Sequence, residues 1–91
     1  MHSIHVTVSI LHEFPDDAAR RAHLDEVVSS VSSQPGFVHG YWLAPRNGQG
    51  DAYVFFDTED HAQASAPALG PHASGMVEIK DVDLCPVLAS A

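Results

Sequence analysis

The order of segments along the 91 residues constrains the fold more than any single motif does. Apolar periodicity predicts six elements in the order strand, helix, strand, strand, helix, strand. Two helices can cover only one face of a four-stranded sheet. Yet Phe37–Ala44 and Ala52–Phe56 are apolar or aromatic on both faces, which is typical of strands buried on both sides. A second copy of the chain is the simplest cover for the other face, so we expect a homodimer.

Length, charge and hydropathy narrow the class of protein. Ninety-one residues fit one domain over residues 1–91. The formal net charge of −8 repels the phosphates of nucleic acids and anionic lipids, so we expect neither as a partner. The N-terminal residues have no basic segment that would start a signal peptide, and no stretch reaches the roughly 20 apolar residues of a membrane helix. We therefore expect a soluble cytoplasmic protein with no membrane contact.

The first strand and the first helix show the clearest periodicity. Residues Ser3–Leu11 alternate, and the apolar face that should meet the helices consists of Ile4, Val6, Val8 and Ile10. The helix should begin near Pro15 and end at Gln34–Gly36. Its predicted buried stripe follows the i, i+3, i+4, i+7 pattern and consists of Leu24, Val27, Val28 and Val31.

The second and third strands should form a hairpin. The strands are predicted over Phe37–Ala44 and Asp51–Phe56. Asn47 and Gly48 lie between them, and this residue pair favours a turn that needs positive φ.

The last elements are a short helix and a long strand. Asp57 or Thr58 should cap the helix, and a loop should follow over residues 68–74. The strand should run over Met76–Val87. Its alternation changes phase at Lys80–Asp81, which predicts a β-bulge or a kink there.

Two local sequences complete this βαββαβ pattern: Gln34–Phe37 enters the second strand, and Phe55–Ala62 passes from the third strand into the second helix. The pattern resembles the dimeric α+β barrel superfamily, and most closely its antibiotic-biosynthesis-monooxygenase-like branch. The resemblance implies an α+β, ferredoxin-like subunit with a four-stranded antiparallel sheet and two helices on one face. It also implies two sheets packed face to face, with a cavity in each subunit. Members include cofactor-independent monooxygenases, quinol monooxygenases, haem-degrading enzymes, isomerases and proteins without known activity, so the fold does not choose an activity.

The haem-degrading members can be compared residue by residue. They carry an asparagine on the first strand, a tryptophan at the end of the third strand and a histidine ligand in the second helical region. Here the only asparagine is Asn47, in the hairpin loop, and Phe56 stands where the tryptophan would fall. The only tryptophan is Trp42, on the second strand. His61 comes too early for the ligand and His72 too late, so we expect no haem degradation.

Seven histidines are many for this length, but their spacing predicts no metal site. His5 and Thr7 lie on the polar face of the first strand, and they line a cavity only if one opens on that side. His39 shares a face of the second strand with Tyr41. A neutral imidazole in a cavity could remove a proton from a phenol or enol, so His5 and His39 are the predicted catalytic bases. The alternative is a polar side chain at a wet interface, and the other histidines, such as His23, are expected at the surface.

Aromatic side chains on the second and third strands indicate contacts with a flat ligand. The predicted ligand-binding residues are Thr7, Tyr41, Trp42, Tyr53 and Phe56. Packing in the core or at a dimer interface is the alternative for each aromatic residue. The sequence has no glycine-rich phosphate loop, nucleophile elbow or Cys-x-x-Cys motif, so we expect no nucleotide, nicotinamide or flavin cofactor.

Together these features predict a homodimeric barrel that binds a small, largely apolar or aromatic molecule. As an enzyme, it would be a cofactor-free monooxygenase acting on a phenol or quinol. The alternative is a non-catalytic structural or interaction dimer whose cavity is filled by its own side chains. An isomerase or lyase that uses the same histidines without oxygen is a third option. The face of the sheet that lines the cavity, and the identity of the ligand, stay open.

Overall fold

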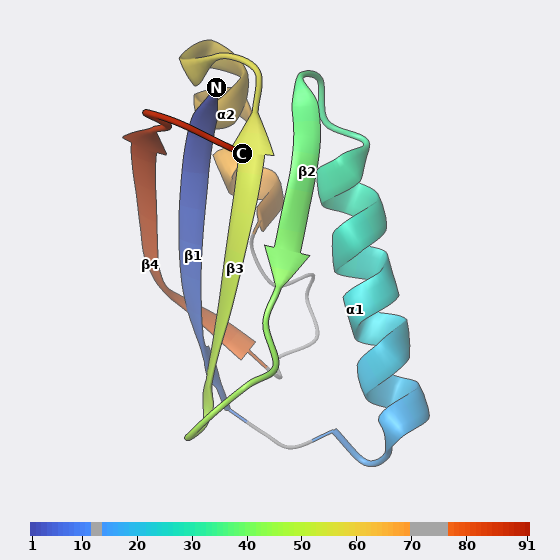
Figure 1. The fold of residues 1–91 in the computed structure, drawn as a ribbon. Coiled ribbons are helices and arrows are strands. Elements are labelled where there is room, and N and C mark those ends of the chain that lie inside the picture. The colour runs from blue at the N-terminus through green and yellow to red at the C-terminus, as the bar shows by residue number, and fades with distance from the viewer. Residues whose placement is uncertain (12–13, 70–76) are drawn as a thin grey trace.

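The computed structural model describes residues 1–11, 14–69 and 77–91 (Figure 1). The elements follow the predicted order: β1 (His2–Ile10), α1 (Asp17–Ser32), β2 (Phe37–Trp42), β3 (Gln49–Phe56), α2 (Glu59–Ser65), a 3-10 turn η1 (Ala66–Leu69) and β4 (Val77–Pro86). The strands form one antiparallel four-stranded sheet in the order β2-β3-β1-β4. This arrangement confirms the α+β, ferredoxin-like fold.

The hydrophobic core lies between the sheet and the helices. Figure 1 shows α2 behind the sheet and α1 alongside the edge strand β2. The core side chains are at most 3% exposed and come from β1, β3 and both helices: Ile4, Val6, Val31, Val54, Phe56 and Ala62. The apolar face of β1 therefore meets the helices, as its alternation predicted.

Helix α1 packs on the rest of the molecule mainly through its C-terminal part. Asp16 caps the helix by accepting a hydrogen bond of 2.8 Å from the backbone N–H of Ala19, close to the predicted start. Val31 is buried, whereas the other residues of the predicted stripe are only half-buried: Leu24, Val27 and Val28. The first two turns, Asp17–His23, contain alanines, charged residues and a histidine but no large apolar side chain. They therefore lack the bulk to pack tightly on the sheet.

The β2–β3 hairpin has the predicted turn. Asn47 and Gly48 have φ values of 54° and 74°, as this turn requires. Arg46 and Gln49 close it with two backbone hydrogen bonds of 2.9 Å. Strand β2 ends at Trp42, two residues before the predicted end, and it lies at an edge of the sheet rather than between two strands.

Two bulges set which side chains face the helices. Thr7 pairs with Asp81 and Val8 with Ile79, which leaves Lys80 as the extra residue and confirms the bulge predicted in the last strand. A second bulge, in β2, was not predicted: Phe37 pairs with Phe56 and His39 with Phe55. Because Val38 is the extra residue there, Phe37 faces the helices and His39 faces the opposite side.

Thr58 caps α2 by accepting a hydrogen bond of 3.1 Å from the backbone N–H of His61. No helix within the described ranges is long and apolar enough to cross a membrane. The loop predicted over residues 68–74 begins within η1, and its residues 70–74 lie outside the described residues. So do the predicted start of the last strand at Met76 and the side chains of His12 and His72.

Candidate functional site

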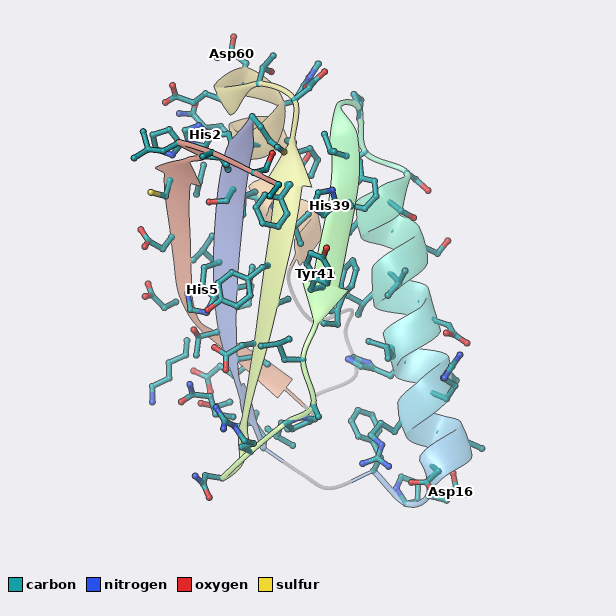
Figure 2. All side chains as sticks on the ribbon, in the orientation of Figure 1. His2, His5, Asp16, His39, Tyr41 and Asp60 are labelled. Atoms are coloured by element: carbon teal, nitrogen blue, oxygen red, sulfur yellow. The ribbon has the colours of Figure 1, made fainter. Side chains whose placement is uncertain are left out.

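The sheet has two faces of different character, because successive side chains of a strand point to opposite sides. We call the side covered by the helices the helix face and the other side the open face. Figure 2 shows His5, His39 and Tyr41 projecting on the same side of the sheet, from β1 and β2. Strand pairing places the following residues together on the open face: Thr7, Tyr53, Phe55, Asp81 and Asp83.

The aromatic residues of the open face, which we call the aromatic layer, pack in two groups. The pairing of Tyr41 with Tyr53 across β2 and β3 places the two groups side by side. The His5 ring stacks on Tyr53, with ring centroids 4.4 Å apart and planes 5° apart. The His39 ring lies 4.7 Å from Phe55, and Tyr41 packs edge-on against His39 at 5.4 Å. Together these contacts join three strands across the open face.

One carboxylate holds His5 in place. His5 Nε2 lies 3.0 Å from Asp51 Oδ1, and the Thr7 hydroxyl donates to the same oxygen at 3.3 Å. The His5 and Asp51 side chains are 36% and 28% exposed, so the pair is only partly shielded from water. One ring nitrogen of His5 is therefore already engaged on the open face.

A groove of about 1150 Å³ opens on the helix face, between α1 and the sheet. Its floor is apolar and comes from β1 and β3: Val6, Val8, Ile10, Gly50 and Ala52. Its roof comes from α1: Arg20, Arg21, His23, Leu24 and Val27. The end of β2 and the start of the hairpin close one side: Trp42, Leu43, Ala44 and Pro45. The first turns of α1, beside this space, carry no large apolar side chain to pack on the floor.

One glycine lines the floor of the groove, and another lies beneath the Trp42 ring at its side. A Cβ at Gly40 would lie 2.9 Å from the ring of Trp42, so the indole lies directly over this glycine. A Cβ at Gly50 would lie 3.1 Å from a methyl group of Val8, so a side chain there would crowd the floor. Because no side chain rises from Gly50, the floor there is low and apolar, and the Trp42 indole borders it, which suits a planar ligand.

Most charged side chains of the groove already have partners. Asp17 forms an ion pair with Arg20, and Arg21 forms one with Asp25 at 3.3 Å. His23 instead packs against Phe14, with ring centroids 5.1 Å apart and planes tilted by 43°. Within residues 1–11, 14–69 and 77–91, neither a hydrogen bond nor an ion pair engages the His23 ring.

The predicted site residues are divided between three places. Trp42 lines the groove. Phe56 is fully buried in the core, where it packs edge-on against Phe37 at 6.0 Å, and it does not line the groove. The others lie together on the open face: His5, Thr7, His39, Tyr41 and Tyr53.

The groove instead contains residues that the sequence analysis did not select, His23 above all. The signal that could have indicated them is the lack of large apolar residues over Asp17–His23. A helix that cannot cover the sheet leaves a space between the two, and the remaining side chains of the helix line that space.

A second histidine–carboxylate pair lies outside the groove, at the start of α2. His61 Nδ1 is 2.6 Å from Asp57 Oδ1. This hydrogen bond, reinforced by the charge of His61, lowers the pKa of the Asp57 carboxyl below its ordinary value of 3.8. Gly36 has a φ of 81°, and a Cβ there would collide with both side chains, so the pair fits against a position that favours glycine. Among the described residues, no group of three His, Cys, Asp or Glu side chains could hold a metal ion.

Solved structures with the same arrangement of elements identify the fold. A variant of SnoaB, a cofactor-independent oxygenase from Streptomyces nogalater, matches with a TM-score of 0.67 and 19% identity over 98% of this chain and 95% of that chain. The chain has the same fold as this oxygenase, and at 19% identity the likeness shows the fold alone. This result confirms, at the level of the fold, the resemblance found in the sequence.

Two other solved proteins with this fold carry different descriptions. A protein of unknown function from Nitrosomonas europaea has a TM-score of 0.65 and 18% identity, over 100% of this chain and 94% of that chain. A heme-degrading protein from Mycobacterium tuberculosis has a TM-score of 0.58 and 17% identity, over 100% and 99%. No family model matches the sequence, and no curated protein matches it. These comparisons show the fold and leave the activity to be argued from the site.

Proposed function

We propose that this protein binds a small, planar, largely apolar molecule in the groove between α1 and the sheet. The observation that carries the proposal is the groove itself, with its volume of about 1150 Å³, its apolar floor and the Trp42 indole at its side. Ligand sites typically occupy about 300–1,000 Å³. A cavity filled by its own side chains would be smaller than this range, so the groove favours ligand binding over the non-catalytic alternative.

We also propose that the protein is a homodimer whose subunits meet through their open faces. Tyr41 is 58% exposed and Tyr53 39% exposed, and they belong to one aromatic layer. Contiguous exposed apolar surface of this kind marks association sites. Two open faces packed together would leave each groove on the outer side of its own sheet. A native mass of two chains at micromolar concentration is expected, and a mass of one chain would contradict the proposal.

The chemistry that best suits such a groove is the cofactor-free oxygenation of a phenol or quinol. A base removes the hydroxyl proton, the anion reacts with dioxygen at a ring carbon, and loss of water leaves a quinone. One oxygen atom stays in the product and the other leaves as water, so the substrate supplies all the electrons. Among proteins of this fold, SnoaB is named a cofactor-independent oxygenase, which supports the proposal. An isomerase or lyase would use the same base but consume no oxygen.

His5 and His39 are the bases that the sequence predicts. Both lie on the open face, so they would act on a substrate only where that face, or the subunit interface, admits one. In that case, replacing either histidine with alanine should lower turnover by about a hundredfold, the usual scale of general-base catalysis. Unchanged turnover in both variants would exclude them from catalysis.

The binding proposal can be tested by thermal unfolding in the presence of polycyclic phenols, quinols, haem and divalent metal ions. A ligand at about 100 times its dissociation constant stabilises the folded state by about 2.7 kcal/mol. We expect a shift with the phenols or quinols, and a smaller shift in the Trp42→Ala variant. Tyr41→Ala, which removes an aromatic ring from the open face, is the matched control. The absence of any shift would favour the non-catalytic dimer. A phenol or quinol that shifts the melting temperature would next be tested for oxygen uptake. The cytoplasmic location of the protein stays a prediction.

A further inference from the structure

We propose that His23 is the proton acceptor of the groove, and that the groove takes a planar molecule with an acidic hydroxyl group, a phenol or an enol. This inference rests on the proposed ligand-binding function of the groove, and it adds the residue that would act on the ligand. Imidazole is the side chain best able to gain or lose a proton near neutral pH. His23 contributes the imidazole among the described residues that line the groove.

The position of His23 suits this role. The residue lies on α1, in the roof of the groove, where its half-buried ring packs against Phe14 on one side. The floor opposite is the apolar surface around Val8 and Gly50. A planar ligand lying on that floor would present its edge, and a hydroxyl group on that edge, to the side chains of the roof.

The other ionisable side chains of the groove are occupied. Asp16 accepts the capping hydrogen bond of α1, and Asp17 pairs with Arg20. Arg21 pairs with Asp25, and Asp51 accepts hydrogen bonds on the open face. Moving a proton onto or off any of these groups would break an existing interaction. His23 could accept one at no such cost, within the described part of the chain.

The charges of the groove also indicate the type of ligand. Both arginines of the roof already face carboxylates, and Asp16 and Asp17 also line the groove. A ligand carrying a permanent carboxylate would meet these acidic groups without a free cation to balance it. A neutral hydroxyl group avoids this repulsion on entry, and it becomes anionic only when its proton moves to His23. The resulting imidazolium then provides the opposite charge.

The proton transfer is balanced within the pair. The O–H bond of the ligand breaks, an N–H bond forms on the His23 ring, and the electron pair stays on the ligand oxygen. In the oxygenation proposed above, dioxygen then adds to the anion. The proton held by His23 returns as the peroxide breaks down to quinone and water.

The test uses alizarin, a planar hydroxyanthraquinone whose anion absorbs at longer wavelength than its neutral form. We expect native protein at neutral pH to bind alizarin and raise the ratio of anion to neutral dye. His23→Gln should bind the dye but lower this ratio about tenfold or more, because an opposite charge nearby shifts such an equilibrium by about 1–3 pK units. His2→Gln, a histidine substitution outside the groove, is the control. Free imidazole should restore the anion signal in His23→Ala, since the groove is open to solvent.

The outcomes separate this inference from the proposed function. Alizarin that binds all variants with the same anion ratio would overturn the role of His23 and leave ligand binding intact. A ratio that falls in His5→Gln or His39→Gln, and not in His23→Gln, would move the base to the open face. Loss of binding in a normally folded His23→Gln variant would make His23 a binding residue and overturn its role as proton acceptor. No binding of alizarin or any other planar phenol to native protein would overturn both proposals.

Discussion

The two faces of the sheet use the same strands for different purposes. On β1, Ile4 and Val6 are 0% and 3% exposed and belong to the core, whereas His5, between them, takes part in the aromatic layer of the open face. On β3, Val54 is fully buried and Tyr53 is 39% exposed. The helix face therefore contains the core of one chain, whereas the open face would meet a second copy in the dimer proposed above. Folding of the chain thus depends on the helix face, and the proposed association depends on the open face.

The helix face itself is not uniform. The part beneath α2 and the C-terminal end of α1 is closed by Phe56, Val31 and Ala62. The part beneath the first turns of α1 is the open groove. The groove and the core thus share a face but not a region, so substitutions can test the proposed ligand binding and the stability of the fold separately.

The largest expected effect belongs to the closed part of the helix face. Phe56→Ala should lower the free energy of unfolding by about 3–5 kcal/mol, because it removes a fully buried ring. The loss should be measured by urea denaturation at several protein concentrations. Phe56→Leu, which keeps most of the volume, should cost much less. Since Phe56 does not line the groove, a large loss of ligand affinity in the folded Phe56→Leu variant would break the division between core and groove.

A substitution on the open face should weaken the proposed dimer rather than the stability of one chain. Tyr53→Ala should weaken the proposed dimer by at least about 2 kcal/mol, or roughly thirtyfold in dissociation constant, as buried interface aromatics do. The ring lost is the one on which His5 stacks. Sedimentation equilibrium would measure the change, with Tyr53→Phe as the control that keeps the ring. An unchanged dissociation constant would place the interface elsewhere.

A substitution in the groove should change ligand affinity and leave the proposed dimer unchanged. Trp42→Ala should weaken binding of a planar phenol by about 1.5–3 kcal/mol, the usual value of burying a large apolar side chain. Titration calorimetry would measure the affinity, and sedimentation would show an unchanged dimer. A dimer that weakens together with ligand affinity would mean that the two faces are not independent.

The sequence predicted the elements of the fold because each has a strong local signal. The alternation of β1 gave its inward face, Asn47–Gly48 gave the hairpin turn, and the change of phase at Lys80 gave the bulge in β4. The bulge at Val38 was missed because no residue there marks it. Its effect is large, since it decides that His39 lies on the open face.

The site was harder to predict than the fold because it depends on a missing contact. The stripe on α1 predicted burial from Leu24 to Val31, and the structure buries only Val31 fully. The groove extends from the first turns of α1 to the half-buried part of the stripe, at Leu24 and Val27, and His23 lines it beside them. A periodic pattern indicates residues that pack, but it does not indicate a space that no side chain fills. The groove follows from apolar side chains that are absent over Asp17–His23.

The smallest expected effect is a change in the pH dependence of stability, and it concerns Asp57 and His61. This pair lies outside both the groove and the aromatic layer, so it is a reference for substitutions in those two regions. The hydrogen bond from His61 lowers the pKa of Asp57 in the folded chain. A lowered carboxyl pKa adds stability above the ordinary value, and this stability is lost as the pH falls through the folded value. Asp57→Asn should therefore be slightly less stable near neutral pH.

On acidification, the melting temperature of Asp57→Asn should fall less than that of the native chain. Melting curves from about pH 6 to about pH 3 would show the two profiles converging. Parallel profiles would mean that the pair contributes nothing to acid sensitivity. Because the pair belongs to neither the groove nor the aromatic layer, Asp57→Asn should leave the dimer and the ligand affinity unchanged. A change in either would show that the turn before α2 is coupled to that face, and that the separation of the two faces is incomplete.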